Sequence, residues 1–296
     1  MLKFKNIEIS DIELYREFLK NNKEFSCENS FVNLLVWQCA YNNMMALYDG
    51  QLFIKSGPGS NQSFRLPIGG DLNKGIKIIE EYSGEKNPSF WIQEGENFSL
   101  LNDYFKEKYD FSENRDASDY IYLTENLANL SGKKYHSKRN HINSFNKKFS
   151  WRYEDIGKDN IEKVKICAEK WYEENVDKSD SYLLCEKNGV EIILNNMELL
   201  NVKGGAIIIE DNVVAFTLGS PINSQVFDVH IEKALKDYAE AYTVINNEFA
   251  KRLTSYKYLN REDDMGLEGL RKAKLSYKPE ILLKKYYCKP KGNTNG

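Results

Sequence analysis

Three ionisable side chains alternate along the apolar segment 226–233, VFDVHIEK. Alternate residues of a strand point to the same face, so Asp228, His230 and Glu232 would share one side. Burying such groups without partners is unfavourable, and such a row is typical of a cleft where a carboxylate orients an amine or an imidazole acts as a general base. An edge strand with a solvated face would show the same pattern. Because alternate strand residues lie too far apart to hold one ion together, we expect no metal site.

A second charged group follows the next strand-like run, in segment 260–279, NREDDMGLEGLRKAKLSYKP. Ligand-binding groups gather beyond the carboxyl ends of strands in α/β folds. We therefore expect Arg261 and Glu262 to meet the row on segment 226–233, and Arg261 and Arg271 to stabilise an oxyanion or a phosphate. Substrate contacts are expected from Asn246 and Glu248 of the preceding helix and from Asn260. A solvated helix with intrahelical ion pairs would also explain the charges in segment 260–279.

The segment 132–152, GKKYHSKRNHINSFNKKFSWR, is strongly basic and carries no carboxylate. Lysine and arginine side chains neutralise phosphates, and a solvated helix normally includes some glutamate for intrahelical pairing. We therefore favour an anionic ligand over a solvated face, and expect four residues to bind it: Lys133, Lys134, Lys138 and Arg139. The interleaved aromatic residues could stack on bases or pack into the core.

The order of the expected elements recurs in the two halves of the chain. Each half gives a strand, helices, short antiparallel strands and further helix–strand units, which predicts two α/β units of similar topology. The ranges are 1–124 and 125–296, the second of which would carry the site. The expected elements include helices at 98–108 and 127–148, an Asp211–Asn212 hairpin turn, and a last strand at 280–287.

Composition excludes several classes of protein. The 296 residues include 41 Lys and Arg against 44 Asp and Glu, so the chain is not a generally basic, nucleic-acid-coating protein, and contact with nucleic acid would need a local patch. The longest apolar stretch is too polar to cross a membrane. Five dispersed cysteines without metal-binding spacing, and no apolar leader, predict reduced thiols, no zinc and a cytoplasmic protein.

Four of these segments together resemble the phosphatidylglycerol lysyltransferase C-terminal-domain family in a stand-alone form. They are DYIYLTENLANLSGKKYHSKRNHINSF at 119–145, FDVHIEKAL at 227–235, INNEFA at 245–250 and YLNREDDMGLEGLRKAKLSYKP at 258–279. The resemblance implies two N-acyltransferase (GNAT-like) domains in tandem, each a mixed, mainly antiparallel sheet flanked by helices. It also implies transfer of an aminoacyl group from a charged tRNA to a lipid or peptidoglycan acceptor. We expect no cofactor, because the glycine-rich turn that binds an acyl-CoA is missing.

The sequence departs from related proteins in two respects. Acetyl-CoA users of the GNAT-like fold carry a glycine-rich turn after the central strand, whereas segment 234–242 here, ALKDYAEAY, has no glycine, which disfavours acyl-CoA. The multispan membrane half of the lipid lysyltransferases is absent, so the resemblance leaves the acceptor open. Dinucleotide and P-loop fingerprints, GxGxxG and GxxxxGK[ST], are absent as well.

These observations favour an acyltransferase in which an amine or a hydroxyl attacks an activated ester, with tRNA or another phosphate-bearing molecule as substrate. Two alternatives remain. The chain could be a non-catalytic RNA- or nucleotide-binding module on a degenerate acyltransferase scaffold, or a small-molecule N-acyltransferase that uses an acyl-CoA. The sequence does not specify the oligomeric state.

Overall fold

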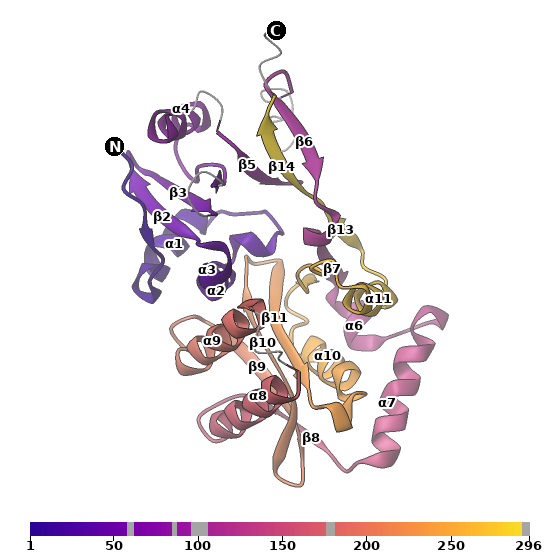
Figure 1. Ribbon diagram of the computed structural model, residues 1–296. Coiled ribbons are helices and arrows are strands. Elements are labelled where there is room, and N and C mark those ends of the chain that lie inside the picture. The colour runs from indigo at the N-terminus through magenta and orange to yellow at the C-terminus, as the bar shows by residue number, and fades with distance from the viewer. Residues whose placement is uncertain (58–61, 85–87, 96–105, 176–180, 292–296) are drawn as a thin grey trace. The chain divides into compact units, whose positions relative to one another are not determined.

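The computed structural model describes residues 1–57, 62–84, 88–95, 106–175 and 181–291 (Figure 1). The chain forms two compact units. Unit 1 comprises Met1–Ser118 and Leu283–Gly296, and unit 2 comprises Asp119–Leu282. Within the described residues each unit contains a mixed, mainly antiparallel sheet flanked by helices, which confirms the predicted fold class.

Unit 1 contains a sheet in the order β1-β2-β3-β4-β5-β14-β6. Its strands are β1 (Lys5–Asn6), β2 (Met44–Tyr48), β3 (Gln51–Ser56), β4 (Ser63–Phe64), β5 (Phe90–Gln93), β6 (Tyr109–Glu113) and β14 (Lys285–Pro290). Its helices include α1 (Ile12–Leu19), α2 (Phe31–Val36), α3 (Gln38–Tyr41) and α4 (Leu72–Ser83). The core of unit 1 includes Phe53, Phe64 and Phe90 of the sheet and Ile79 of α4, which are all at most 1% exposed.

The predicted boundary after residue 124 and the assignment of the whole C-terminus to the second domain both need correction. Strand β7 (Asp119–Leu123) pairs with β12 (Tyr258–Asn260) and so belongs to unit 2. In contrast, β14 pairs with both β5 and β6 of unit 1 (Figure 1). The run predicted as one strand at 280–287 is therefore two strands, β13 (Ile281–Leu283) and β14, which lie in different sheets. An apolar run predicts a strand but does not predict its partner.

Unit 2 contains a sheet in the order β13-β7-β12-β11-β10-β9-β8. The strands not yet given are β8 (Arg152–Asp155), β9 (Lys203–Ile209), β10 (Asn212–Pro221) and β11 (Val226–Ala234). The helices are α6 (Thr124–Asn129), α7 (His136–Lys148), α8 (Ile161–Asn175), α9 (Ser181–Asn195), α10 (Ala241–Arg252) and α11 (Glu268–Ser276). Helix α10 packs on β9, β10 and α7 through an apolar face that includes Val244 and Ile245.

Two local predictions in unit 2 are wrong in their details. The β9–β10 hairpin turns at Glu210–Asp211, one residue earlier than predicted, because both residues adopt positive φ (48° and 65°), as a tight two-residue hairpin requires. The helix predicted at 127–148 is interrupted after α6, where Leu130 (φ 48°) and Gly132 (φ 86°) are left-handed. The side chain of Asn247 donates to the Leu127 and Ala128 carbonyls and satisfies the end of α6.

In unit 1, most of the helix predicted at 98–108 lies outside the described residues, and its last three residues, 106–108, form a turn. Strand β6 follows directly and was not predicted. Its sequence, YDFSE, places polar residues between the apolar ones, as expected for a strand at the edge of a sheet. Strand β6 is such an edge strand and lies beside β14.

Two irregularities in the unit 2 sheet determine where functional side chains lie. The β10–β11 register shifts so that Leu218 lies opposite Ile231 and Gly219 opposite Val229, which leaves a β-bulge at His230. Strands β11 and β12 run parallel and pair over three residues only, ending at Asp228 and Asn260. Beyond those residues β11 continues to Ala234 while the chain after β12 turns away, so residues 230–232 and 261–262 follow the point of separation.

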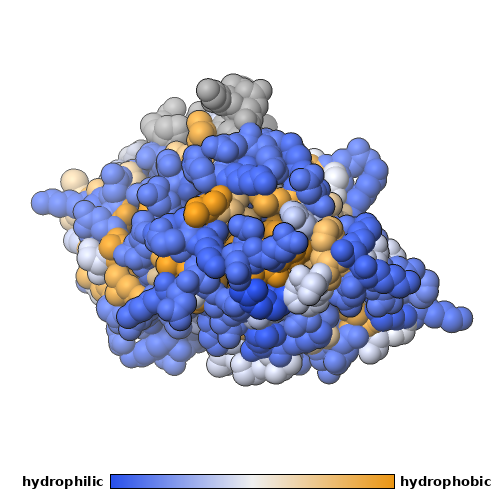
Figure 2. Space-filling model, turned by 90° about the horizontal axis from the view of Figure 1, so that it is seen from below, coloured by the Kyte–Doolittle hydropathy of each residue, from blue (hydrophilic) through white to orange (hydrophobic). Residues whose placement is uncertain are grey.

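The surface of the chain is mainly polar. The face shown in Figure 2 is dominated by hydrophilic residues, with hydrophobic ones in separate patches. Among the described residues, no helix combines the length and the hydropathy that crossing a bilayer would require. Cys27, Cys167 and Cys288 are buried free thiols.

Candidate functional site

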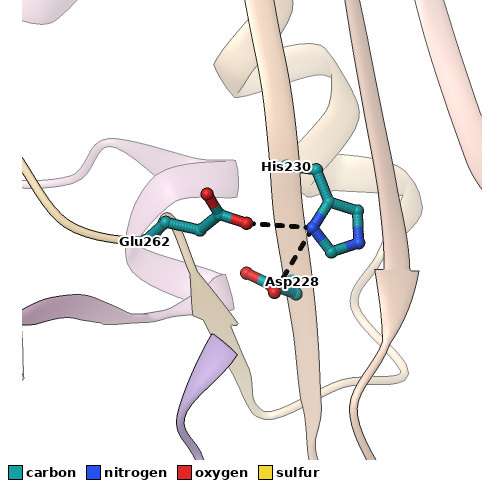
Figure 3. Close-up of side chains that lie close together, drawn as sticks. All are labelled: Asp228, His230 and Glu262. Atoms are coloured by element: carbon teal, nitrogen blue, oxygen red, sulfur yellow. Dashed lines mark hydrogen bonds and ion pairs between the residues drawn. The ribbon is translucent and has the colours of Figure 1, made fainter. Parts of the chain in front are cut away.

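His230 is surrounded by two carboxylates and a hydroxyl in unit 2 (Figure 3). Its Nδ1 lies 3.0 Å from Oε1 of Glu262 and 3.4 Å from Oδ2 of Asp228, and its Nε2 lies 2.8 Å from Oγ of Ser220. Asp228 is fully buried, and the side chains of His230 and Glu262 are 3% and 14% exposed. The imidazole is thus held at both nitrogens, which fixes its orientation. We call Ser220, Asp228, His230 and Glu262 the histidine cluster.

The backbone after β12 brings Glu262 to this cluster. Asn260 is buried between strands, donates to Oδ2 of Asp119 and accepts a 2.7 Å hydrogen bond from the amide of Glu262. Glu262 itself is left-handed, with φ at 53°. A glutamate rarely adopts this conformation, so local hydrogen bonding and pairing of the flanking strand hold it there. Asn260 therefore positions Glu262 through its side chain.

Glu232 belongs to a different cluster, because the bulge at His230 puts it on the opposite face of β11 from Asp228. Its Oε1 lies 2.6 Å from Nη2 of Arg261, and its Oε2 accepts a 3.1 Å hydrogen bond from Nδ2 of Asn246. The predicted row of three groups is thus divided between two sets of partners. Nη1 of Arg261 and Oδ1 of Asn246 are buried without a hydrogen-bond partner among the described residues. One donor and one acceptor are therefore left beside a single carboxylate.

Aromatic rings surround Arg261. Its guanidinium carbon lies 4.9 Å from the ring centre of Tyr277 and 5.8 Å from that of Tyr122. Burial disfavours the charge, but the neighbouring Glu232 carboxylate outweighs burial, so the pKa of Arg261 is raised. The cation is therefore permanent, and contacts with the rings add to its stabilisation.

Lys138 of α7 also reaches this second cluster. Its Nζ lies 3.8 Å from the ring centre of Tyr277. Burial and the positive charge of Arg261 lower the pKa of Lys138 to about 8, an effect that Glu232 partly opposes. An amine with this pKa is substantially neutral near pH 8, so it can accept a proton. We call Lys138, Glu232, Asn246 and Arg261 the arginine cluster.

Arg271 does not join the arginine cluster. It donates to both carboxylate oxygens of Asp264, over 2.9 and 2.7 Å, while the hydroxyl of Tyr120 donates to the same carboxylate. Burial would raise the pKa of Asp264, but the hydrogen bonds from Arg271 and Tyr120 lower it to about 2. Lys274, also on α11, donates to the backbone carbonyls of Arg261 and Asp263. These contacts fasten α11 to the loop that carries Arg261 and Glu262.

Four of the predicted substrate-binding residues lie apart from both clusters in what the structure describes. Glu248 pairs within α10, with Lys251 at 2.6 Å and Arg252 at 3.4 Å. Arg139 donates to the carbonyls of Leu130 and Gly132 and so stabilises the break before α7. The other two, Lys133 and Lys134, are exposed on the short turn before α7.

Other elements partly neutralise the basic segment 132–152. Lys148 pairs with Glu240 at 2.6 Å, and Arg152 pairs with Glu154 and Asp211 at 2.8 and 3.0 Å. The charge is therefore less concentrated than the sequence indicates. Its exposed end, at Lys133 and Lys134, lies just before Lys138 along the chain.

Several residues of the site were not predicted. Ser220 lies opposite Asp228 in the hairpin register, and that register was the signal that could have identified it. Asp264, Lys274, Tyr122 and Tyr277 were unassigned because their roles depend on long-range packing. Tyr122 donates to the carbonyl of Lys274, 152 residues later, a contact that no local pattern indicates.

Comparison with known proteins gives consistent matches. Residues 20–289 match the family model described as phosphatidylglycerol lysyltransferase, C-terminal. A conserved protein of unknown function from Bacteroides thetaiotaomicron is similar in structure, with 36% identity, coverage of 98% of this chain and 100% of that one, and a TM-score of 0.89. L-PGS from Bacillus licheniformis has 16% identity, coverage of 96% and 93%, and a TM-score of 0.65. The similarity to L-PGS, at 16% identity, concerns the fold alone.

An uncharacterized protein of Mycoplasmoides gallisepticum is 26% identical over 196 residues, which cover 63% of this chain and 61% of that protein. The chain thus matches less than two thirds of that relative's length.

Proposed function

Because the chain belongs to the phosphatidylglycerol lysyltransferase C-terminal family, with its tandem GNAT-like fold, we propose that it is an acyltransferase that moves an aminoacyl group at the arginine cluster of unit 2. The observation that carries the proposal is the pair of buried atoms left beside Glu232, Nη1 of Arg261 and Oδ1 of Asn246. An aminoacyl ester offers a carbonyl oxygen, which accepts hydrogen bonds, and an ammonium group, which donates them.

In this proposal Arg261 binds the ester carbonyl oxygen and stabilises the negative charge that develops there. The ammonium group is held by Asn246 and Glu232. An amine or a hydroxyl of the acceptor attacks the carbonyl carbon, a new C–N or C–O bond forms, and the ester C–O bond to the donor breaks. The attacking group gives its proton to a base, and the donor hydroxyl receives one as it leaves.

Two groups are candidates for the base. Lys138 has a pKa of about 8 and lies in the arginine cluster. His230 lies in the neighbouring histidine cluster, with Asp228 and Glu262 beside it. A general base works best when its pKa is near the working pH, which favours Lys138.

A charged tRNA is the donor that fits the surroundings of this cluster. Lys133 and Lys134 lie exposed on the segment that leads into α7, and Lys138 follows on the helix itself. This arrangement would place phosphate-binding groups beside the group that reacts. The proposed donor also agrees with the absence of glycine from the segment between β11 and α10, since backbone amides there would be the expected CoA contacts.

The test is a comparison of charged and uncharged tRNA. The full chain is incubated with bulk tRNA carrying radiolabelled amino acids, in the presence and absence of phosphatidylglycerol vesicles or small amines as acceptors. Faster loss of the label from tRNA than spontaneous hydrolysis, abolished in Arg261→Met and retained in Glu268→Gln, would support the proposal. Binding of tRNA without any loss of label would instead favour a non-catalytic RNA-binding module. Consumption of acetyl-CoA would favour a small-molecule N-acyltransferase.

A further inference from the structure

We propose that Asp228, His230 and Glu262 bind a divalent transition-metal ion such as Zn²⁺ or Mn²⁺. Each residue offers one ligand atom, and the three atoms lie within 4.8 Å of one another. The prediction that this strand holds no metal site considered Asp228, His230 and Glu232. The structure replaces Glu232 with Glu262, which approaches His230 from the loop after β12 (Figure 3).

The distances from His230 to the two carboxylates match those of a metal coordination shell. Nδ1 of His230 lies 3.0 Å from Oε1 of Glu262 and 3.4 Å from Oδ2 of Asp228. Ligands bound to zinc at about 2.1 Å lie roughly 3.0 to 3.4 Å apart in octahedral and tetrahedral arrangements. An ion could therefore be bound with small adjustments of side-chain torsions.

The charges in the cluster also suit a bound cation. Two carboxylates face one ring nitrogen, one of them fully buried and the other with a side chain 14% exposed. If Nε2 donates its proton to Ser220, which lies 2.8 Å away, Nδ1 presents a lone pair toward both carboxylates. A positive charge between these atoms, either the second proton of an imidazolium or a metal ion, would stabilise the arrangement.

The contact on Nε2 is also what a metal-binding histidine requires. Histidine ligands usually hold their second ring nitrogen in a hydrogen bond, which fixes the tautomer and the ring orientation. Ser220 provides that contact. A donor set of one imidazole nitrogen and two carboxylate oxygens favours Zn²⁺, Mn²⁺ or Fe²⁺ over Mg²⁺ and Ca²⁺, which prefer oxygen ligands alone.

Metal binding is tested directly on the purified full chain. The protein is stripped with EDTA and dialysed, and then titrated with ZnCl2, MnCl2 or MgCl2 by calorimetry, with thermal unfolding measured in parallel. We expect one ion per chain, preference for Zn²⁺ or Mn²⁺ over Mg²⁺, and a rise in Tm of about 5 to 10 °C when the free ion is about a hundredfold above Kd. Bound Mn²⁺ would also change its electron paramagnetic resonance spectrum.

Variants identify the ligands. Glu262→Gln and His230→Gln should each weaken binding at least about tenfold. Glu248→Gln is the matched control, since this carboxylate pairs within α10 and should leave binding unchanged. If His230→Gln fails to fold, Glu262→Gln, which keeps the shape of the side chain, still decides the question.

Two outcomes would overturn the proposal. The first is equal binding in the control and the cluster variants, which would indicate adventitious sites elsewhere. The second is no saturable binding of any ion while NMR shows protons on both ring nitrogens of His230, which would identify the imidazolium as the balancing charge. Neither outcome bears on aminoacyl transfer at the arginine cluster, because the readout is binding of the metal alone.

Discussion

Separating the Arg261–Glu232 ion pair should strongly destabilise unit 2. The two side chains are 11% and 12% exposed, so each charge depends on the other for compensation. Replacing Glu232 by Gln leaves the guanidinium buried without its carboxylate. Breaking a buried pair in this way costs about 3–5 kcal/mol. In a unit that spans residues 119–282, each kcal/mol lowers Tm by about 2–4 °C, which gives a loss of roughly 6–20 °C.

A double-mutant cycle separates the pair from its surroundings. Arg261→Met should be about as destabilising as Glu232→Gln, because it leaves the carboxylate buried. The double variant Glu232→Gln/Arg261→Met removes both charges and should be much more stable than the sum of the single variants predicts, since it leaves no uncompensated buried charge. A coupling energy of at least about 2 kcal/mol would result.

The assay is native-state hydrogen exchange followed by mass spectrometry, read on peptides from β11, with urea unfolding in parallel. The control is Glu268→Gln, which breaks an exposed pair with Lys272 whose side chains are 80% and 74% exposed. It should change stability by less than about 0.5 kcal/mol. The reasoning would be refuted if Glu232→Gln cost no more than this control, or if the double variant were as unstable as the sum of the single ones.

Three further predictions concern unit 2. Carbon-13 NMR of the reductively methylated chain should show Lys138 titrating near pH 8, because burial and Arg261 lower its pKa in the folded chain from 10.5. Between pH 8 and 10.5 the unfolded chain binds more protons than the folded one, so the free energy of unfolding should rise with pH across that window. The variant Lys138→Met should abolish this rise. Gly219→Ala should cost about 1–3 kcal/mol in urea unfolding, since a Cβ would overlap the Asp228 carbonyl and the Phe227 ring. Asp264→Asn should cost about 1–3 kcal/mol by weakening the contacts with Arg271 and should increase exchange in α11.

Each of these predictions has an outcome that would contradict it. A Lys138 resonance that titrates with the bulk of the lysines would show that its amine is solvated. Unchanged stability of Gly219→Ala would mean that the bulge relaxes freely. Unchanged exchange in α11 of Asp264→Asn would show that other contacts hold this helix.

The sequence predicted the site to the extent that its pattern is local. The alternation of Asp228, His230 and Glu232 follows from strand geometry, and the three residues do lie on one strand. Their division into two clusters could not be predicted, because it depends on a bulge at His230 and on a left-handed Glu262. Both features arise from the register between strands and from a loop, neither of which leaves a periodic signal.

The fold shows the same division between local and long-range information. The β2–β3 hairpin turns at Asp49–Gly50, two residues that readily adopt positive φ, so this turn carries a local sequence signal. The basic segment was read as uncompensated because the sequence does not show that Glu240 reaches Lys148 across 92 residues. The pairing of β14 with β5 and β6 joins segments that lie far apart in the chain, so no local sequence pattern indicates it.

The position of β14 has a consequence for how this chain is synthesised and folds. Unit 2 is one continuous stretch, so it can fold on the ribosome as soon as residue 282 has emerged. Unit 1 cannot complete its sheet then, because β14, the strand between β5 and β6, is translated only after the whole of unit 2. Until it arrives, two strand edges are open to pairing with other nascent chains. Truncation of the chain before residue 285 would therefore damage unit 1 more than unit 2.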